Sequence, residues 1–412
     1  MSAVTKPIIL DETFGAKMDA LNHLISHQNA AIDLLASDKR ASLVTDIATV
    51  AELCKSGEIL EVMDYGDQIA PAWANGGTSY NPALNLCHEA DAILEDQETI
   101  HGAFFEWDKT TPVGVPFDQP EAIYYCDGTE GTGDHYITVG VAYGTGWTAG
   151  LNIQVTFSVA PAENDQLVIN CGTDNKNNPA GGRTWNLYAK GSTTSKDTGT
   201  TSVGNNGTQL GTTHATDAQK TNGRVNAPSR VCYGYNRWLH SALRQYLNSE
   251  GAADTWWSAQ NAWDRPPAVA STLAGFLAGY EEGVRRYFKP IKVVTVACNA
   301  DDNEEDVTYD KVFLSSLEQM YCVPQFSGKE GEYWEYYKRL LGRTTPAPTG
   351  ATYARLKKYG LDTPTTAQYC WRRSAHRSTA VNVWYVNASG YVNCFSSAYN
   401  AIMCAPSVFI SD

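Results

Sequence analysis

The chain has no Cys-x-x-Cys motif, no apolar run of about 18 residues and no hydrophobic region of the kind that signal peptides carry. The first absence leaves no sign of a zinc ribbon or a thioredoxin-type site, and the second leaves no candidate transmembrane helix. Without a secretory signal, we expect synthesis in a cytoplasm and ten reduced cysteines that serve as small buried apolar residues.

Cationic residues are also scarce. The chain has 31 Lys and Arg against 45 Asp and Glu, for a net charge of -14 and an isoelectric point near 5.0. Nucleic acids and anionic membranes are bound by basic surfaces, so we predict neither as a partner.

Signals for catalysis and for cofactors are missing as well. No GxxxxGK[ST] phosphate loop occurs, and the eight histidines are scattered rather than placed with a nucleophile. The acidic run at 301–306 lacks the spacing of an EF-hand, which favours a solvated loop over a calcium site. We therefore predict no catalytic residues, no cofactor and no metal ion.

The pattern of apolar residues divides the chain into segments. Residues 1–58 are predicted to be a helical oligomerisation or docking segment, with an ordinary amphipathic helix as the alternative. Short strands are expected over 59–119, and evenly spaced alternating strands over 120–218 predict an antiparallel β-sandwich. Residues 191–222 are expected to form an exposed loop or hairpin tips. The heptad positions of the first segment are Phe14, Met18, Leu21, Ile25, Gln28, Ile32 and Leu35.

Residues 230–249 predict an amphipathic helix that begins at Asn236 as its N-cap. Arg244 and Asn248 are expected to satisfy buried backbone groups. The segment resembles the Y-x-x-N-x-W-x-x-S-x-x-R-x-x-L-N-S signature of bacterial and phage C-type lectin-like domains. Its matching residues are Tyr233, Asn236, Trp238, Ser241, Arg244, Leu247, Asn248 and Ser249. The later KVFLSSLEQMY resembles that family's FLPS-x-E element, with Ser315 in place of the proline and Glu318 at the acidic position.

The C-terminal region, 371–405, has an unusual composition. Between Arg373 and Cys404 there is no Asp, Glu, Lys or Gln, while Ser, Asn, Tyr, Ala and Val are frequent. Tyrosine offers a rigid amphipathic face, and Ser and Asn offer adaptable hydrogen bonds, as in antibody paratopes. The alternation in VNVWYVNASGYVNCF equally indicates a pair of strands with a turn at the glycine. A binding surface and buried strands are compatible interpretations.

This region resembles the variable region of the target proteins of diversity-generating retroelements, the class that includes the phage major tropism determinants. In that family, a reverse transcriptase randomises template adenines, so Asn-type codons cannot become Lys, Glu, Gln, Trp or Met. Apart from Trp371, Trp384 and Met403, every residue from Tyr369 to Cys404 belongs to the accessible set. The resemblance implies an α+β protein. A C-type lectin-like (formylglycine-generating-enzyme-like) domain, formed by 59–119 and 219–412, would carry the sandwich of 120–218 as an insertion.

The resemblance also implies a function. The protein would be a ligand-binding adhesin, a phage or prophage receptor-binding tail protein that acts outside the cell after assembly into a virion. Its partners would be a host-cell surface protein or glycan, other tail proteins and further copies of itself, with a trimer favoured. The alternatives are an enzyme of the formylglycine-generating type, which needs a pair of active cysteines that no motif establishes here, and a fixed structural tail or baseplate protein.

Two groups of residues follow from this interpretation. Within the hairpin of 381–395, alternate side chains should face outward, which favours Asn382, Tyr391 and Asn393 over Val383 and Val392. The expected scaffold residues are Trp371, Arg373, Gly390, Ala398 and Pro406. The predicted ligand-binding residues are His376, Arg377, Ser378, Thr379, Asn382, Tyr385, Asn387, Tyr391, Asn393, Phe395, Ser396, Ser397, Tyr399 and Asn400.

Overall fold

The structure is a computed structural model that describes residues 46–118, 124–139, 151–170, 182, 184–211, 234–260 and 264–412. Strands account for 38% and helices for 15%, in several sheets. The prediction of an α+β protein is therefore confirmed to the extent that helices and strands are mixed, with strands in the majority. The predicted heptad helix, from Phe14 to Leu35, lies outside the described residues, as does Tyr233 of the lectin-like signature.

Two short helices open the described chain. Helix α2 (Ile47–Ser56) starts at Asp46, whose carboxylate accepts from the Ala48 N–H at 3.2 Å, and it ends at Gly57 in the left-handed conformation. Val50, Ala51 and Cys54 bury its inner face against the first sheet. Helix α3 (Ile59–Val62) follows. The expectation that strands begin at Ile59 is wrong here, because Ile59 anchors a single helical turn in the core.

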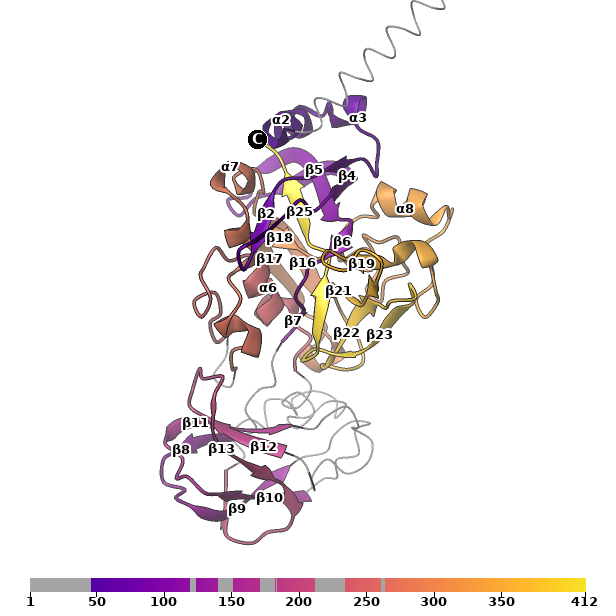
Figure 1. Ribbon diagram of the computed structural model, residues 1–412. Coiled ribbons are helices and arrows are strands. Elements are labelled where there is room, and N and C mark those ends of the chain that lie inside the picture. Colours follow the sequence, from indigo (N-terminus) through magenta and orange to yellow (C-terminus); the bar gives the residue numbers. More distant parts are fainter. Residues whose placement is uncertain are drawn as a thin grey trace, which may run out of the picture.

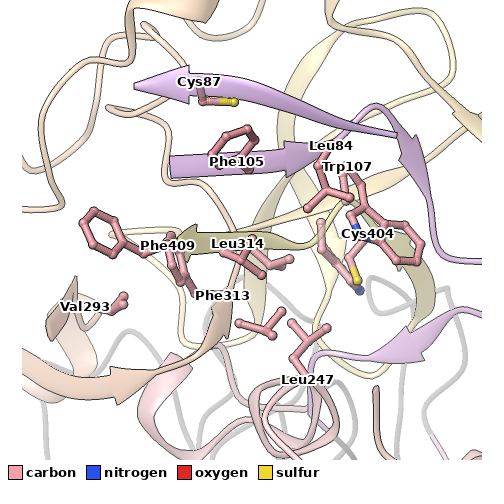
Figure 2. Packing of buried hydrophobic residues seen from close by; sticks show 14 of the residues in the cluster. Leu84, Cys87, Phe105, Trp107, Leu247, Val293, Phe313, Leu314, Cys404 and Phe409 are labelled. Carbon is pink, nitrogen blue, oxygen red and sulfur yellow. The ribbon is translucent and has the colours of Figure 1, made fainter. Parts of the chain in front are cut away.

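The first sheet is antiparallel and has five strands in the order β1-β4-β5-β25-β18. These are β1 (Gln68–Ile69), β4 (Leu84–Ile93), β5 (Thr99–Trp107), β25 (Ser407–Ile410) and β18 (Val312–Phe313). The last strand of the chain thus pairs between an early strand and a middle one. Figure 2 shows side chains of this sheet, among them Leu84, Phe105 and Phe409, that belong to one buried hydrophobic cluster.

The second five-stranded sheet has the order β23-β22-β21-β24-β7. Its strands are β23 (Val392–Ser397), β22 (Asn382–Val386), β21 (Cys370–Ala375), β24 (Ala401–Cys404) and β7 (Val115–Pro116). Strands β21 and β24 run parallel, and the other pairs are antiparallel. We call β21, β22 and β23 the display sheet, because these strands carry six of the fourteen predicted ligand-binding residues and the segments that join or follow them carry the other eight.

Three small sheets complete this part of the molecule. One is the hairpin of β16 (Ile291–Val296) and β17 (Glu305–Asp310). Strands β2 (Trp73–Asn75) and β3 (Thr78–Tyr80) form a second hairpin. Strand β19 (Lys358–Gly360) lies between β20 (Ala367–Gln368) and β6 (Lys109–Thr110).

The described residues between 124 and 209 form two four-stranded sheets, drawn as a separate lobe in Figure 1, which we call the β-sandwich lobe. One has the order β13-β12-β11-β8, from β8 (Tyr124–Asp127), β11 (Glu163–Asn170), β12 (Thr184–Tyr188) and β13 (Ser195–Thr200). The other has the order β14-β10-β9-β15, from β9 (Gly133–Val139), β10 (Leu151–Phe157), β14 (Ser202–Val203) and β15 (Thr208–Gln209). Phe157 and Trp185 meet edge to face at 5.5 Å between the sheets.

Two expectations for this lobe need correction. The pairing is not purely antiparallel, since β15 runs parallel to β9. Residues 191–222 were expected to form a loop or hairpin tips, yet their described part contains β13, β14 and β15. Small residues there have a packing role, because a Cβ on Gly199 would lie 2.8 Å from the Trp185 ring.

The remaining helices are short: η1 (Trp238–His240), α6 (Ala242–Leu247), η2 (Ala268–Ser271), η3 (Phe276–Gly279), α7 (Glu282–Arg285), η4 (Asn299–Asp301), α8 (Glu335–Leu341) and η5 (Ala354–Leu356). The single helix predicted from Asn236 is wrong. Ser241 has an extended backbone and caps α6, with its hydroxyl accepting from the Arg244 N–H at 2.9 Å. Asn248 does satisfy backbone groups: its Oδ1 accepts from the Lys311 and Val312 N–H groups at 2.8 and 3.1 Å.

Candidate functional site

Strand β23 of the display sheet has one inward and one outward set of side chains. Val383, Val392 and the scaffold residue Trp371 are fully buried. Asn382, Tyr391 and Asn393 are partly exposed, as the sequence predicts. The predicted alternation holds along β23 but not along β22, where Trp384 and the two residues after it are all buried. The register between β22 and β23 shifts between Val383 and Tyr385, which is a β-bulge. Bulges redirect side chains, and beside this one Phe395 has 78% of its surface exposed.

An aromatic pair lies beside Asn393. Tyr369 and Tyr385 stack with their ring centroids 5.6 Å apart, and the Asn393 Nδ2 donates to the Tyr385 hydroxyl at 3.0 Å. Tyr385 itself is only 7% exposed, whereas Tyr369 is 47% exposed. Tyr369, which is absent from the predicted ligand-binding set, therefore offers more surface to a ligand than Tyr385. Its type and its place just before β21 were the signals that could have found it.

Asn387 belongs to the turn between β22 and β23. Its Oδ1 accepts from the Ser389 N–H, the Ser389 hydroxyl and the Tyr391 N–H, at 2.9, 2.7 and 2.9 Å. Gly390 has φ +87°, and a Cβ there would lie 2.2 Å from the Tyr353 carbonyl oxygen. The Asn387 side chain is thus committed to the turn, and Gly390 has the scaffold role that was expected of it.

The segment 376–379 joins β21 to β22. Asn236 fixes the end of this segment and the start of β22, since the Asn236 Nδ2 donates to the carbonyl oxygens of Thr379 and Asn382, both at 2.7 Å. His376 Nδ1 lies 3.2 Å from the Thr379 hydroxyl, and burial lowers the pKa of His376. Arg377 is exposed, and its Nε donates to Asn299 Oδ1 at 3.2 Å. Ser378 and Thr379 are partly exposed.

The end of β23 and the turn after it contain four more predicted residues. Ser397 and Asn400 are partly exposed, whereas Ser396 is 8% exposed and accepts from the Asn400 Nδ2 at 3.1 Å. Tyr399 packs against the hydrophobic core of the β-sandwich lobe. Its ring therefore contacts the protein itself, so Tyr399 is a poorer ligand contact than the sequence suggested.

Behind the display sheet, Arg372 and Glu106 form a buried ion pair that sequence reasoning missed. The Glu106 carboxylate accepts from Arg372 Nη1 at 3.0 Å and from the Ser315 hydroxyl at 2.6 Å, and Lys358 Nζ lies 2.9 Å away. Burial alone would raise the pKa of Glu106, but Lys358 and Arg372 lower it to about 2. Tyr337 donates to the same carboxylate. The network connects β21 to β5 of the first sheet.

Arg373, the neighbouring scaffold residue, is also buried and is bound to backbone. Its Nη1 donates to the Leu314 carbonyl oxygen at 2.6 Å, and its Nη2 donates to the Glu330 carbonyl oxygen. Burial lowers the pKa of Arg373 to about 10. Ala398 and Pro406 are buried as well. The predicted ligand-binding residues thus stand on a sheet whose inner side is fixed by packing and by buried charge.

The eight cysteines in the described part of the chain do not offer an activated thiol. All eight are buried. A catalytic cysteine acts as a thiolate, which requires access and a lowered pKa. Burial instead raises the pKa of Cys54, Cys87, Cys126, Cys322, Cys370, Cys394 and Cys404.

The described ranges contain neither a metal-binding cluster nor a membrane-spanning helix. These residues contain no group of three or more His, Cys, Asp and Glu side chains that could hold a metal ion. In the acidic run, Asp306 and Glu304 accept from Arg237, at 2.6 and 2.7 Å from its Nη2. No helix in the described part of the chain is both long and apolar enough to cross a membrane.

Comparison with known proteins gives one match. Residues 217–406 match a family described as a domain of unknown function, DUF6273. No curated protein matches the chain, and no solved structure does. The matched segment includes the display sheet and the lectin-like signature, and it excludes the described strands of the β-sandwich lobe.

Proposed function

We propose that this protein is a receptor-binding adhesin of a phage or prophage tail, and that its display sheet is diversified by a retroelement. In this proposal, 59–119 and 219–412 form a C-type lectin-like domain, and the β-sandwich lobe is an insertion into it. The pairing of the C-terminal strand β25 with β5 supports this division, because it joins the two parts of the chain on either side of the lobe.

One observation carries the proposal. Asn393, Phe395 and Ser397 point outward from β23, while Val392, Cys394 and Ser396 on the same strand are buried. A protein fold tolerates change at exposed positions and resists it at packed ones. This strand therefore separates residues that can vary from residues that must not, and the exposed Phe395 ring resembles the aromatic anchors of binding surfaces.

The ligand would be a host-cell surface protein or glycan, and the protein would act outside the cell after assembly with other tail proteins. Homo-oligomerisation, with a trimer favoured, would raise the avidity of weak single sites by bringing copies to a high effective concentration. Light scattering at micromolar concentration tests this part, and a monomer would contradict it.

An enzyme of the formylglycine-generating type is the main alternative. That chemistry needs a reactive pair of cysteines, and the raised pKa of Cys370, Cys394 and Cys404 makes their thiols poor nucleophiles. A fixed tail protein is the other alternative, and sequence variation among isolates separates it from the diversified adhesin.

The decisive experiment is to sequence this locus in many sister isolates. We expect a near-copy of the segment that encodes Tyr369 to Asp412 beside a reverse-transcriptase gene, with differences concentrated at adenines. Codons for Asn393, Phe395 and Ser397 should vary among isolates, and those for Val392, Trp371 and Gly390 should not. A locus without such a copy, with an invariant segment, would overturn the diversification.

Attachment is tested separately with the purified protein on cells of the strain that carries the receptor. Alanine at Tyr391, Asn393 and Phe395 together should abolish attachment. The matched control places alanine at Thr363, Thr365 and Thr366, which are also exposed but lie outside the proposed surface. Equal attachment by both triple variants would show that the display sheet is not the binding surface.

A further inference from the structure

A cleft of about 1250 Å³ lies between strands β4 and β16, the segment 318–335 and helix α8. None of the fourteen predicted ligand-binding residues lines it, so it is distinct from the display surface. Its floor is aromatic: the ring centroids of Phe104 and Trp334 are 5.3 Å apart, and those of Phe104 and Phe313 are 6.0 Å apart.

Strand β16 presents an open edge to this cleft. Within the described residues, β16 pairs with β17 on one side. On its other side, a single isolated β-bridge joins Ile291 to Leu94. At the far end, the Val296 N–H points away from β17 and donates to Glu330 Oε1 at 3.0 Å. Residues two apart in a strand direct their backbone groups to the same side. Val294 therefore directs its N–H and C=O groups into the cleft that it lines.

The segment 318–335 supplies an aromatic wall. Tyr321 and Tyr333 meet edge to face with ring centroids 5.1 Å apart, and Tyr333 is 36% exposed. Tyr321 has φ +57°, a conformation that is strained for a bulky residue. Backbone hydrogen bonds hold it there, from the Tyr321 N–H to the Glu318 carbonyl oxygen at 2.9 Å and from the Ala347 N–H to the Tyr321 carbonyl oxygen at 2.8 Å.

The charge of the same wall is negative. The Glu332 side chain is 87% exposed, and its ion-pair neighbour is His88, at 3.7 Å. Burial lowers the pKa of His88, so the imidazole is neutral near pH 7 and leaves the Glu332 charge unbalanced. Of the four lining cations, Lys329 and Lys338 are paired with Glu305 and Glu335, and Arg373 donates to backbone carbonyl oxygens. The fourth, Lys292, lies on β16. A cation from outside is the complementary partner for Glu332.

We propose that this cleft binds an extended basic peptide segment of a partner protein, which adds a strand to β16. The Val294 N–H would donate to the peptide backbone and its C=O would accept from it, as in β-strand addition. A Lys or Arg side chain of the peptide lies over the Tyr333 ring, where a cation is attracted to the π face, and beside the Glu332 carboxylate. The site is independent of the receptor-binding role proposed for the display sheet.

The test uses the full-length protein and a fluorescein-labelled octapeptide of alternating Lys and Val, with binding followed by fluorescence anisotropy. A peptide of alternating Glu and Val should bind at least tenfold more weakly. Glu332→Lys and Tyr333→Ala should each weaken binding of the Lys peptide by about fivefold, from the loss of one ion pair or one cation–π contact. Lys292→Glu, at the cleft-lining cation on β16, should strengthen it.

Two further probes separate strand addition from general attraction to an acidic protein. In two versions of the Lys peptide, the N–H groups of either the Lys or the Val residues are methylated, and only one version should lose binding. Phe395→Ala on the display sheet should leave binding unchanged. Equal binding of the Lys and Glu peptides, no binding of either, or indifference to both methylation patterns would overturn the proposal.

Discussion

At the scale of single residues, exposure and burial predict opposite consequences for neighbours on β23. Phe395→Ala removes a side chain that is 78% exposed, so the free energy of unfolding should change by less than about 0.5 kcal/mol. Val392→Ala removes two buried methyl groups from the same strand and should cost about 2 kcal/mol. Urea denaturation of both variants checks this. A Phe395→Ala protein as unstable as Val392→Ala would show that the ring is packed.

The buried Glu106 carboxylate makes stability depend on pH. Its pKa falls from 4.5 to about 2 in the folded protein, so it stabilises the fold above pH 4.5, and this contribution is lost as the pH falls towards 2. Removing one partner of a buried ion pair leaves the other charges unpaired, which typically costs about 3–5 kcal/mol. Glu106→Gln should lower stability at pH 7 and flatten its decline between pH 4.5 and 2. Thermal unfolding at several pH values measures this, and parallel curves for the two proteins would contradict it.

At the scale of elements, Gly390 fixes the hairpin between β22 and β23. Gly390→Ala places a methyl group 2.2 Å from the Tyr353 carbonyl oxygen at φ +87°, so backbone must move, and the loss of stability should exceed about 2 kcal/mol. Gly76→Ala is the matched control. Gly76 also has positive φ, +56°, but nothing lies within 4 Å of its added Cβ, so about 1 kcal/mol is expected. Similar losses in denaturant unfolding would mean that the close approach is unimportant.

The local pattern of apolar and polar residues predicted burial well where that pattern alone determines it. The alternation over 381–395 gave the buried Val383 and Val392 and the outward Asn393. The local pattern failed at Ser241, whose hydroxyl caps helix α6, so that the predicted helix does not begin at Asn236. The Asn236 side chain instead binds the segment 376–379. A contact between residues more than 140 positions apart leaves no periodic signal in the sequence, so propensity could not reveal it.

At the scale of the whole molecule, the sequence separated the sandwich strands from the rest of the chain, but it could not show how the lobe is attached. The Arg265 guanidinium lies 3.6 Å from the centre of the Tyr188 ring, and the Gln166 Nε2 donates to the Asp264 carbonyl oxygen at 3.0 Å. The buried network of Glu106 and Arg372 was equally hidden, because each charge by itself predicts a surface position. Such pairings depend on the folded arrangement and not on spacing along the chain.

Tyr399 connects the display sheet to the β-sandwich lobe, because it follows β23 and packs against the core of the lobe, together with the buried Val381. Tyr399→Ser should therefore loosen strands β9 to β12, which deuterium exchange would report as faster exchange in 133–139 and 163–170. Tyr391→Ser is the control, since Tyr391 is partly exposed on the same hairpin but pairs with Thr352 instead, and it should leave exchange in the lobe unchanged. If neither variant accelerated exchange in the lobe, sequence changes on the display sheet would be independent of the lobe. If Tyr399→Ser alone accelerates exchange, diversification at position 399 is restrained by folding, and the freely variable surface is smaller than the variable sequence.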